Sequence, residues 1–128
     1  MNGRTVLQRD AFDVGALARR KAELGLTTSV VIPARDAGPA VGAVVTAIHA
    51  AMAPMKGTDI ALVDELVVVD GGSRDDTVAQ AERAGARVVH QTADDGLGKG
   101  AALRRGVAAT TGDLVAFVDA DVRDPDAW

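Results

Sequence analysis

The chain has 128 residues, of which 48% are hydrophobic and 25% are charged. These proportions are typical of a folded globular protein and exclude a disordered one, and the length leaves room for one domain. The formal net charge of -4 and an aromatic content of only 2% argue against nucleic-acid binding, because phosphate backbones attract basic surfaces and single-stranded bases stack on aromatic side chains.

The sequence contains no cysteine, which excludes disulfides, thiolate metal sites and a cysteine nucleophile. Residues 1–13 lack the apolar segment of a signal peptide, so a cytoplasmic location is expected. Residues 37–55 carry no Asp, Glu, Lys or Arg over nearly the length of a membrane span. Alanine, glycine and proline make up most of this stretch, so it is predicted to form a buried helix instead of a membrane span.

A helix is predicted ahead of the first strand. Asp13 has the chemistry of a helix N-cap, and Gly25 that of a helix stop. Val14, Leu17 and Leu24 recur at helical spacing and are predicted to form its buried stripe. Residues 1–26 are therefore interpreted as an N-terminal helical extension.

Four strands and three further helices are predicted to alternate after this extension. Apolar, β-branched runs predict the strands, at 27–33, 62–70, 86–91 and 113–119. Periodic apolar residues with typical helix starts and stops predict the helices, at 39–53, 75–85 and 98–112. The order helix then βαβαβαβ predicts an α/β, Rossmann-like parallel sheet with helices on both faces. Residues 1–128 would form a single, partial domain, because no helix is predicted after the last strand.

Acidic residues follow three of the predicted strands, at 33–37, 70–75 and 119–121. Ligands of open parallel sheets bind beyond the carboxyl ends of the strands, so these segments are candidate site loops. In the last of them, Asp119 and Asp121 stand at alternate positions, where two carboxylates can share one cation, and oxygen ligands suit Mg²⁺ or Mn²⁺. The same residues would also serve as a solvated turn, so this pattern alone leaves both interpretations open.

Two further motifs combine glycines with polar residues. Asp70 and the two glycines after it could bind a base or ribose, although a tight turn before a helix would use the same residues. GLGKG at 96–100 places Lys99 at a helix start that favours anions, although it matches neither strict phosphate-binding fingerprint. His49 and His90 are interpreted as residues without a catalytic role.

Taken together, four segments resemble a known family. They are IPARDAG (32–38), VVVDGGSRDDT (67–77), GKGAAL (98–103) and FVDAD (117–121), in that order and on these elements. The combination resembles the nucleotide-binding half of a GT-A fold, family-2-type glycosyltransferase, over about residues 12–128. Within that family it is most similar to the glucosyl-3-phosphoglycerate synthases. The resemblance implies retaining transfer of glucose from UDP-glucose to 3-phosphoglycerate, with Mg²⁺ or Mn²⁺ as cofactor.

The resemblance also implies a set of site residues. Lys99 would face the uridine or the diphosphate, Asp119 would touch the ribose, and Asp121 would hold the metal ion that bridges the diphosphate. The residues expected at the nucleotide sugar are Pro33, Ala34, Arg35, Asp36, Ala37, Asp70, Gly71, Lys99, Asp119 and Ala120. Ala37 and Gly71 stand where the family more often has an acidic residue and a serine, and no catalytic residue is assigned.

Other functions remain open from the residues alone. VAFVDADV resembles the nucleophile strand of a haloacid dehalogenase-type phosphatase, but Arg123 stands where Thr or Val is expected. A receiver-like signalling domain would use Asp70 as phosphoacceptor, but only Asp36 is acidic after the first strand, and no fifth strand is predicted. A non-catalytic nucleotide-sugar-binding protein fits equally well. A four-stranded half sheet would expose one edge, so a homodimer is also expected unless a partner covers it.

Overall fold

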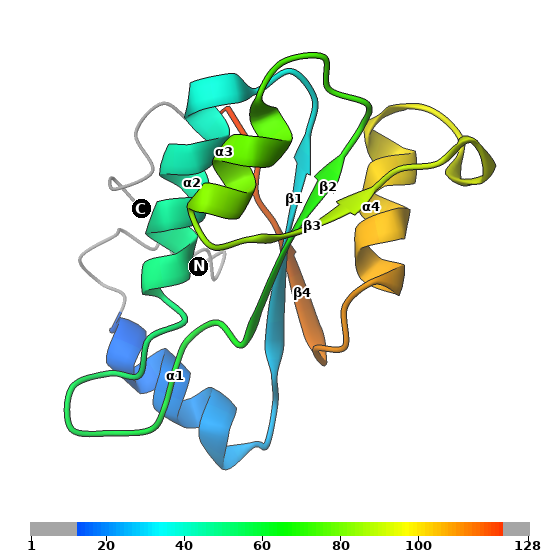
Figure 1. Cartoon of the computed structure of the whole chain (residues 1–128). Helices are drawn as coiled ribbons and strands as arrows, with labels where there is room; N and C mark the ends of the chain where they lie inside the picture. Colours follow the sequence, from blue (N-terminus) through cyan, green and yellow to red (C-terminus); the bar gives the residue numbers. More distant parts are fainter. Residues whose placement is uncertain (1–12, 122–128) are drawn as a thin grey trace, which may run out of the picture.

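The computed structural model describes residues 13–121 (Figure 1). The strands are β1 (Thr28–Ala34), β2 (Glu65–Asp70), β3 (Arg87–His90) and β4 (Leu114–Phe117). The helices are α1 (Val14–Glu23), α2 (Gly38–Ala50), α3 (Thr77–Arg83) and α4 (Gly98–Ala108), with a short 3-10 turn, η2, at Ala93–Asp95. The predicted order of elements is confirmed. Arg123 and the first part of the predicted extension, residues 1–12, lie outside the described residues.

All the pairings in the sheet are parallel, and the strand order is β3-β2-β1-β4. Helices α2 and α3 lie on one face of the sheet and α4 on the other (Figure 1). On β1, Val30 and Ile32 belong to the cluster that includes α2 and α3, whereas Val31 belongs to the cluster on the α4 side. The prediction of a central sheet covered on both faces is therefore confirmed.

The stretch without charged residues at 37–55 forms α2 and the turn after it. Val41, Val44 and Val45 of this helix are buried against the sheet. Within residues 13–121, no helix combines the length and the apolar character that crossing a bilayer requires. The prediction of a buried helix is confirmed.

The apolar stripe predicted on α1 is wrong. Val14, Leu17 and Leu24 are 51–54% exposed, and Ala18 is the buried residue of the helix. The reason is the position of α1, which lies near the amino end of β1 (Figure 1). An ion pair between Lys21 and Asp64, which directly precedes β2, ties the helix to the sheet there. The larger apolar side chains consequently face outward.

Three strands are shorter than predicted, β3 by one residue at each end. Strand β2 begins at Glu65, and the Asp64 carboxylate just before it accepts a hydrogen bond from the backbone N–H of Thr28 at 2.8 Å. Strand β4 ends at Phe117, whose register partner is Val31. Residues 119–121 are thereby left outside the sheet, where they can form a loop at its carboxyl edge.

Carboxylates also organise the opposite, amino end of the sheet. Asp113 accepts hydrogen bonds from the backbone N–H and the hydroxyl of Thr27, at 2.9 and 3.0 Å, and the backbone bond foremost lowers the pKa of Asp113. The pKa of Glu65 is likewise lowered, first by the hydroxyl of Ser29 at 2.7 Å and then by the backbone N–H of Thr111 at 2.8 Å. At the amino end of the sheet, these carboxylates therefore connect the strands to the loops before them.

Close packing of α4 on β1 depends on Gly106. This residue is buried, and a Cβ built on it would overlap Cγ1 of Val31. Any other residue at this position would push α4 away from Val31. The missing side chain of Gly106 therefore allows α4 to pack directly on β1.

Gly106→Ala is expected to lower the free energy of unfolding by about 1–3 kcal/mol, because overpacking forces the helix or Val31 to move. Gly100→Ala on the same helix is the matched control, since its Cβ would meet only the end of the Arg104 side chain, at 3.8 Å. The control should be neutral or more stable by up to about 1 kcal/mol, the gain from alanine in a helix. Urea denaturation measures both. Equal stability of the two variants would contradict the packing argument.

Candidate functional site

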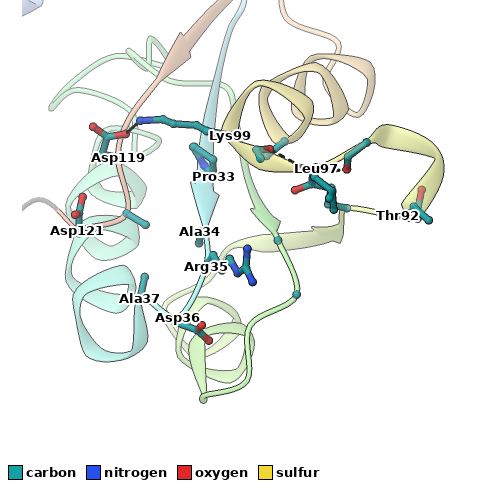
Figure 2. A pocket seen from close by; sticks show the side chains of 18 residues that line it. Pro33, Ala34, Arg35, Asp36, Ala37, Thr92, Leu97, Lys99, Asp119 and Asp121 are labelled. Carbon is teal, nitrogen blue, oxygen red and sulfur yellow. Dashed lines mark hydrogen bonds and ion pairs between the residues drawn. The ribbon is translucent and has the colours of Figure 1, made fainter.

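A pocket of about 700 Å³ lies at the carboxyl edge of the sheet (Figure 2). Its volume is in the range of about 300–1,000 Å³ that is typical of small-molecule sites. The end of β1 and the segments that follow all four strands line it, namely residues 33–37, 71–72, 91–93 with 96–99 and 102, and 119–121. The three loops predicted from the sequence are thus brought together, and every predicted site residue except Asp70 lines the pocket.

The loop after β1 is fastened to the turn after β2. The backbone N–H of Asp36 donates to the Ser73 hydroxyl at 3.0 Å, and the Asp36 carboxylate accepts from the N–H of Arg74 at 2.7 Å. Asp36 has a φ of 48°, a left-handed conformation that these bonds maintain. Arg35 extends from the end of β1 toward the side of the pocket formed by Thr92 and Leu97 (Figure 2).

Thr77, at the start of α3, also forms hydrogen bonds to the loop after β1. Its buried hydroxyl accepts hydrogen bonds from the N–H groups of Ala37, at 2.9 Å, and Gly38, at 3.0 Å. The same hydroxyl donates to the Asp75 carboxylate, which also accepts from the N–H of Gly38 at 3.0 Å. The bond from the Thr77 hydroxyl is the main cause of a lowered pKa at Asp75. These bonds hold this wall of the pocket rigidly.

Asp70 differs from the other predicted site residues in lying outside the pocket lining. It is 5% exposed and is not part of the pocket lining. Its carboxylate accepts from the N–H groups of Gly72, at 3.2 Å, and Ser73, at 3.3 Å, and lies 3.5 Å from Nδ1 of His90. These bonds make Asp70 part of the turn after β2. A carboxylate can accept further hydrogen bonds, so its contact with a nucleotide sugar stays a prediction.

The opposite wall is formed by the start of α4. The helix begins at Gly98, and the side chain of its N-cap residue, Leu97, makes no capping hydrogen bond. Unsatisfied N–H groups at a helix start carry partial positive charge and attract anions. Lys99, in the first turn, forms an ion pair with Asp119 across the pocket (Figure 2). A second positive group is therefore present at the same wall.

The residues that could hold a cation are Asp119 and Asp121. Residues 13–121 contain no cluster of three or more His, Cys, Asp or Glu side chains that could hold a metal ion. Asp119 is paired with Lys99, whereas Asp121 is exposed and forms no ion pair with any other described residue. Mg²⁺ usually binds through one or two carboxylates, the remaining positions being taken by phosphate oxygens and water. This donor set fits a cation that is bound together with a phosphate-containing ligand.

The prediction missed the loop after β3. Gln91, Thr92 and Leu97 line the pocket, and Leu97 is 95% exposed. The loop is internally braced, because Thr92 and Asp95 form a reciprocal capping box around η2. The rule that ligands bind at the carboxyl ends of strands applies to β3 as well, and would have indicated these residues.

Comparison with known proteins agrees with this geometry. The sequence model described as "Glycosyl transferase family 2" matches residues 29–128. Glucosyl-3-phosphoglycerate synthase from Mycolicibacterium smegmatis is 46% identical over an alignment of 123 residues that covers 92% of this chain and 38% of that protein. This chain therefore spans under two fifths of the length of that relative.

Solved structures give the same result. Glucosyl-3-phosphoglycerate synthase from Mycobacterium tuberculosis in complex with uridine diphosphate (UDP) matches with a TM-score of 0.77 at 39% identity, covering 91% of this chain and 41% of that chain. The complex of the same enzyme with Mn²⁺, UDP-glucose and phosphoglyceric acid matches with a TM-score of 0.75 at 39% identity, covering 90% of this chain and 39% of that chain. The predicted fold class, the nucleotide-binding half of a GT-A fold, is confirmed.

Proposed function

Because this chain belongs to glycosyl transferase family 2, we propose that its pocket binds a uridine diphosphate sugar together with Mg²⁺ or Mn²⁺. The observation that carries the proposal is the pocket itself, which combines the start of α4, Lys99 and the carboxylates of Asp119 and Asp121. A diphosphate needs positive groups, and a cation needs oxygen ligands. The phosphatase and receiver hypotheses do not agree with the family of the chain.

The proposed reaction is retaining transfer of glucose from UDP-glucose to 3-phosphoglycerate. The names of the relatives support it, as does the M. tuberculosis complex with Mn²⁺, UDP-glucose and phosphoglyceric acid. Non-catalytic binding of a nucleotide sugar is the second candidate. The residues of the described pocket are all assigned to binding the sugar donor, and this chain covers only about two fifths of the length of those relatives.

In the proposal, the phosphates lie against Lys99 and the start of α4. A cation held by Asp121 would neutralise the charge that develops on the diphosphate as it leaves. Asp119 would turn from Lys99 to a ribose hydroxyl once the phosphates bind Lys99. The residues proposed to surround the rest of the nucleotide sugar are Pro33, Ala34, Arg35, Asp36, Ala37, Asp70, Gly71 and Ala120.

The proposal also concerns the organisation of the protein. Residues 1–128 are taken as one partial nucleotide-sugar-binding domain, with 1–26 as its extension, in the cytoplasm and without a nucleic-acid partner. A homodimer through β4 is included, because this strand lies at the sheet edge with Leu114 and Phe117 about half exposed. Exposed apolar edge strands favour pairing with another chain.

Thermal unfolding tests donor binding. UDP with Mn²⁺ is expected to raise the Tm, whereas UDP with a chelator, or ADP or GDP with Mn²⁺, is expected to have little effect. A ligand at 100 times its Kd stabilises the native state by about 2.7 kcal/mol, a readily measured shift. Equal shifts for the three nucleotides, or no shift for UDP, would contradict the proposal.

A further inference from the structure

One corner of the pocket lies at the ends of β2 and β3. Gln91 directly follows β3, and its backbone N–H donates to the carbonyl of Asp70 at 2.9 Å, which places it beside the end of β2. Gln91 and Gly71 both line the pocket. A Cβ built on Gly71 would lie 3.4 Å from Oε1 of Gln91, so the glutamine amide lies directly beside this glycine.

The orientation of the Gln91 amide is fixed by the loop. Its Nε2 donates to the carbonyl oxygens of Gly96, at 2.9 Å, and Gly98, at 3.3 Å. The reverse orientation would place the amide oxygen against two carbonyl oxygens, where neither partner can donate. Oε1 therefore points to the Gly71 side, and no residue in the range 13–121 donates a hydrogen bond to it. This leaves a positioned acceptor at the pocket wall.

The position of this acceptor in the sheet indicates which end of a bound nucleotide it would contact. Strand order places β3 at the opposite edge of the sheet from β4. The carboxylates of Asp119 and Asp121 follow β4, and Lys99 is paired with the first of them. If the diphosphate lies there, the nucleoside extends toward β2 and β3. Asp70 also lies at the end of β2, but it is 5% exposed and its carboxylate already accepts two N–H groups of the turn after β2.

We propose that Gln91 determines base specificity, its Oε1 accepting a hydrogen bond from the N3–H of uracil. The inference rests on the proposed function, because it needs a uridine nucleotide in this pocket. Uracil carries a hydrogen at N3, whereas N3 of cytosine is an acceptor and would oppose Oε1. A site built around such a hydrogen bond rejects a ligand that leaves its polar group unpaired. Gln91 thus selects uracil over cytosine.

The test compares UDP and CDP binding, with Mn²⁺, to the 128-residue chain and to its Gln91→Met variant by isothermal titration calorimetry. Methionine keeps the length of the side chain but removes the acceptor and the two donated bonds. The wild type should bind UDP at least tenfold more tightly than CDP. In the variant, the affinity for UDP should fall about tenfold more than that for CDP, so the ratio approaches one.

Thr92→Val is the matched control for a loosened loop, because it removes the hydroxyl bonded to Asp95 at 3.0 Å and leaves Gln91 intact. It should weaken both nucleotides by the same factor. If Gln91→Met also weakens both equally, or changes neither, Gln91 only positions the loop, and the inference is wrong. A wild type that prefers UDP over ADP and GDP but not over CDP contradicts the inference alone. A wild type without any preference for UDP overturns the proposed function as well.

Discussion

Asp121→Ala is expected to abolish the metal-dependent part of the stabilisation by UDP while leaving the unliganded protein folded. The side chain is exposed and forms no ion pair with other described residues, so within residues 13–121 its removal breaks no ion pair. It is also close in sequence to Asp119, and removing one of two like charges relieves repulsion when no cation is present. The unliganded Tm should therefore stay the same or rise slightly. The Tm is measured with UDP, with and without Mn²⁺.

Asp59→Ala is the matched control for this change. It removes one negative charge from an exposed loop residue that is not part of the pocket lining. The control should retain the whole effect of Mn²⁺ on UDP binding. Unfolding of Asp121→Ala without ligand would show that Asp121 is a structural cap, and an unchanged response to Mn²⁺ would show that the cation is held elsewhere.

The sheet was predictable because its central strands are buried on both faces. Continuous apolar runs such as those of β1 and β2 occur where helices cover both sides of a parallel sheet, and the burial of Val67, Val68 and Val69 agrees. The orientation of α1 was not predictable in this way. Its periodicity fixes which side chains share a face, but the face that meets the sheet depends on contacts distant in sequence, such as the ion pair between Lys21 and Asp64, 43 positions apart.

The charged residues of the site could be predicted from the sequence. Asp119, Asp121 and Lys99 follow strands or begin a helix, and they meet at one edge of the sheet as the topology requires. Gln91 carries no charge, and its role depends on contacts to Gly96 and Gly98 that arise only from the folded loop. Sequence chemistry identifies which groups could bind, while the direction in which each points is a result of local hydrogen bonding.

For Asp70, a charged residue, the sequence likewise does not predict the direction of the side chain. The sequence predicts a carboxylate at the end of β2, and it is found there. Whether it faces a ligand or the backbone depends on the turn after β2, whose N–H groups at residues 72 and 73 are aimed at it. A glycine pair after a strand-end aspartate is therefore as much a turn signal as a binding signal.

In a transfer assay, the 128-residue chain is expected to form glucosyl-3-phosphoglycerate at less than about one hundredth of the rate of the M. smegmatis relative. Transfer needs the acceptor hydroxyl held about 3–3.5 Å from the anomeric carbon, and losing such positioning removes a large part of the catalytic effect. The acceptor carries a phosphate and a carboxylate, which require cationic partners. Within the described lining, the cationic side chains are Lys99 and Arg35, and both are assigned to the donor.

Radiolabelled transfer from UDP-glucose to 3-phosphoglycerate, with Mn²⁺ and equal molar amounts of the two proteins, measures the difference. The stabilisation by UDP provides the internal control, because it shows whether the donor site of the short chain is occupied under the assay conditions. A chain that binds UDP with Mn²⁺ but does not transfer glucose places donor recognition within these residues and acceptor positioning elsewhere. Turnover comparable to that of the relative would show instead that this chain, or its dimer, builds the acceptor site from residues assigned here to loops and to the donor pocket.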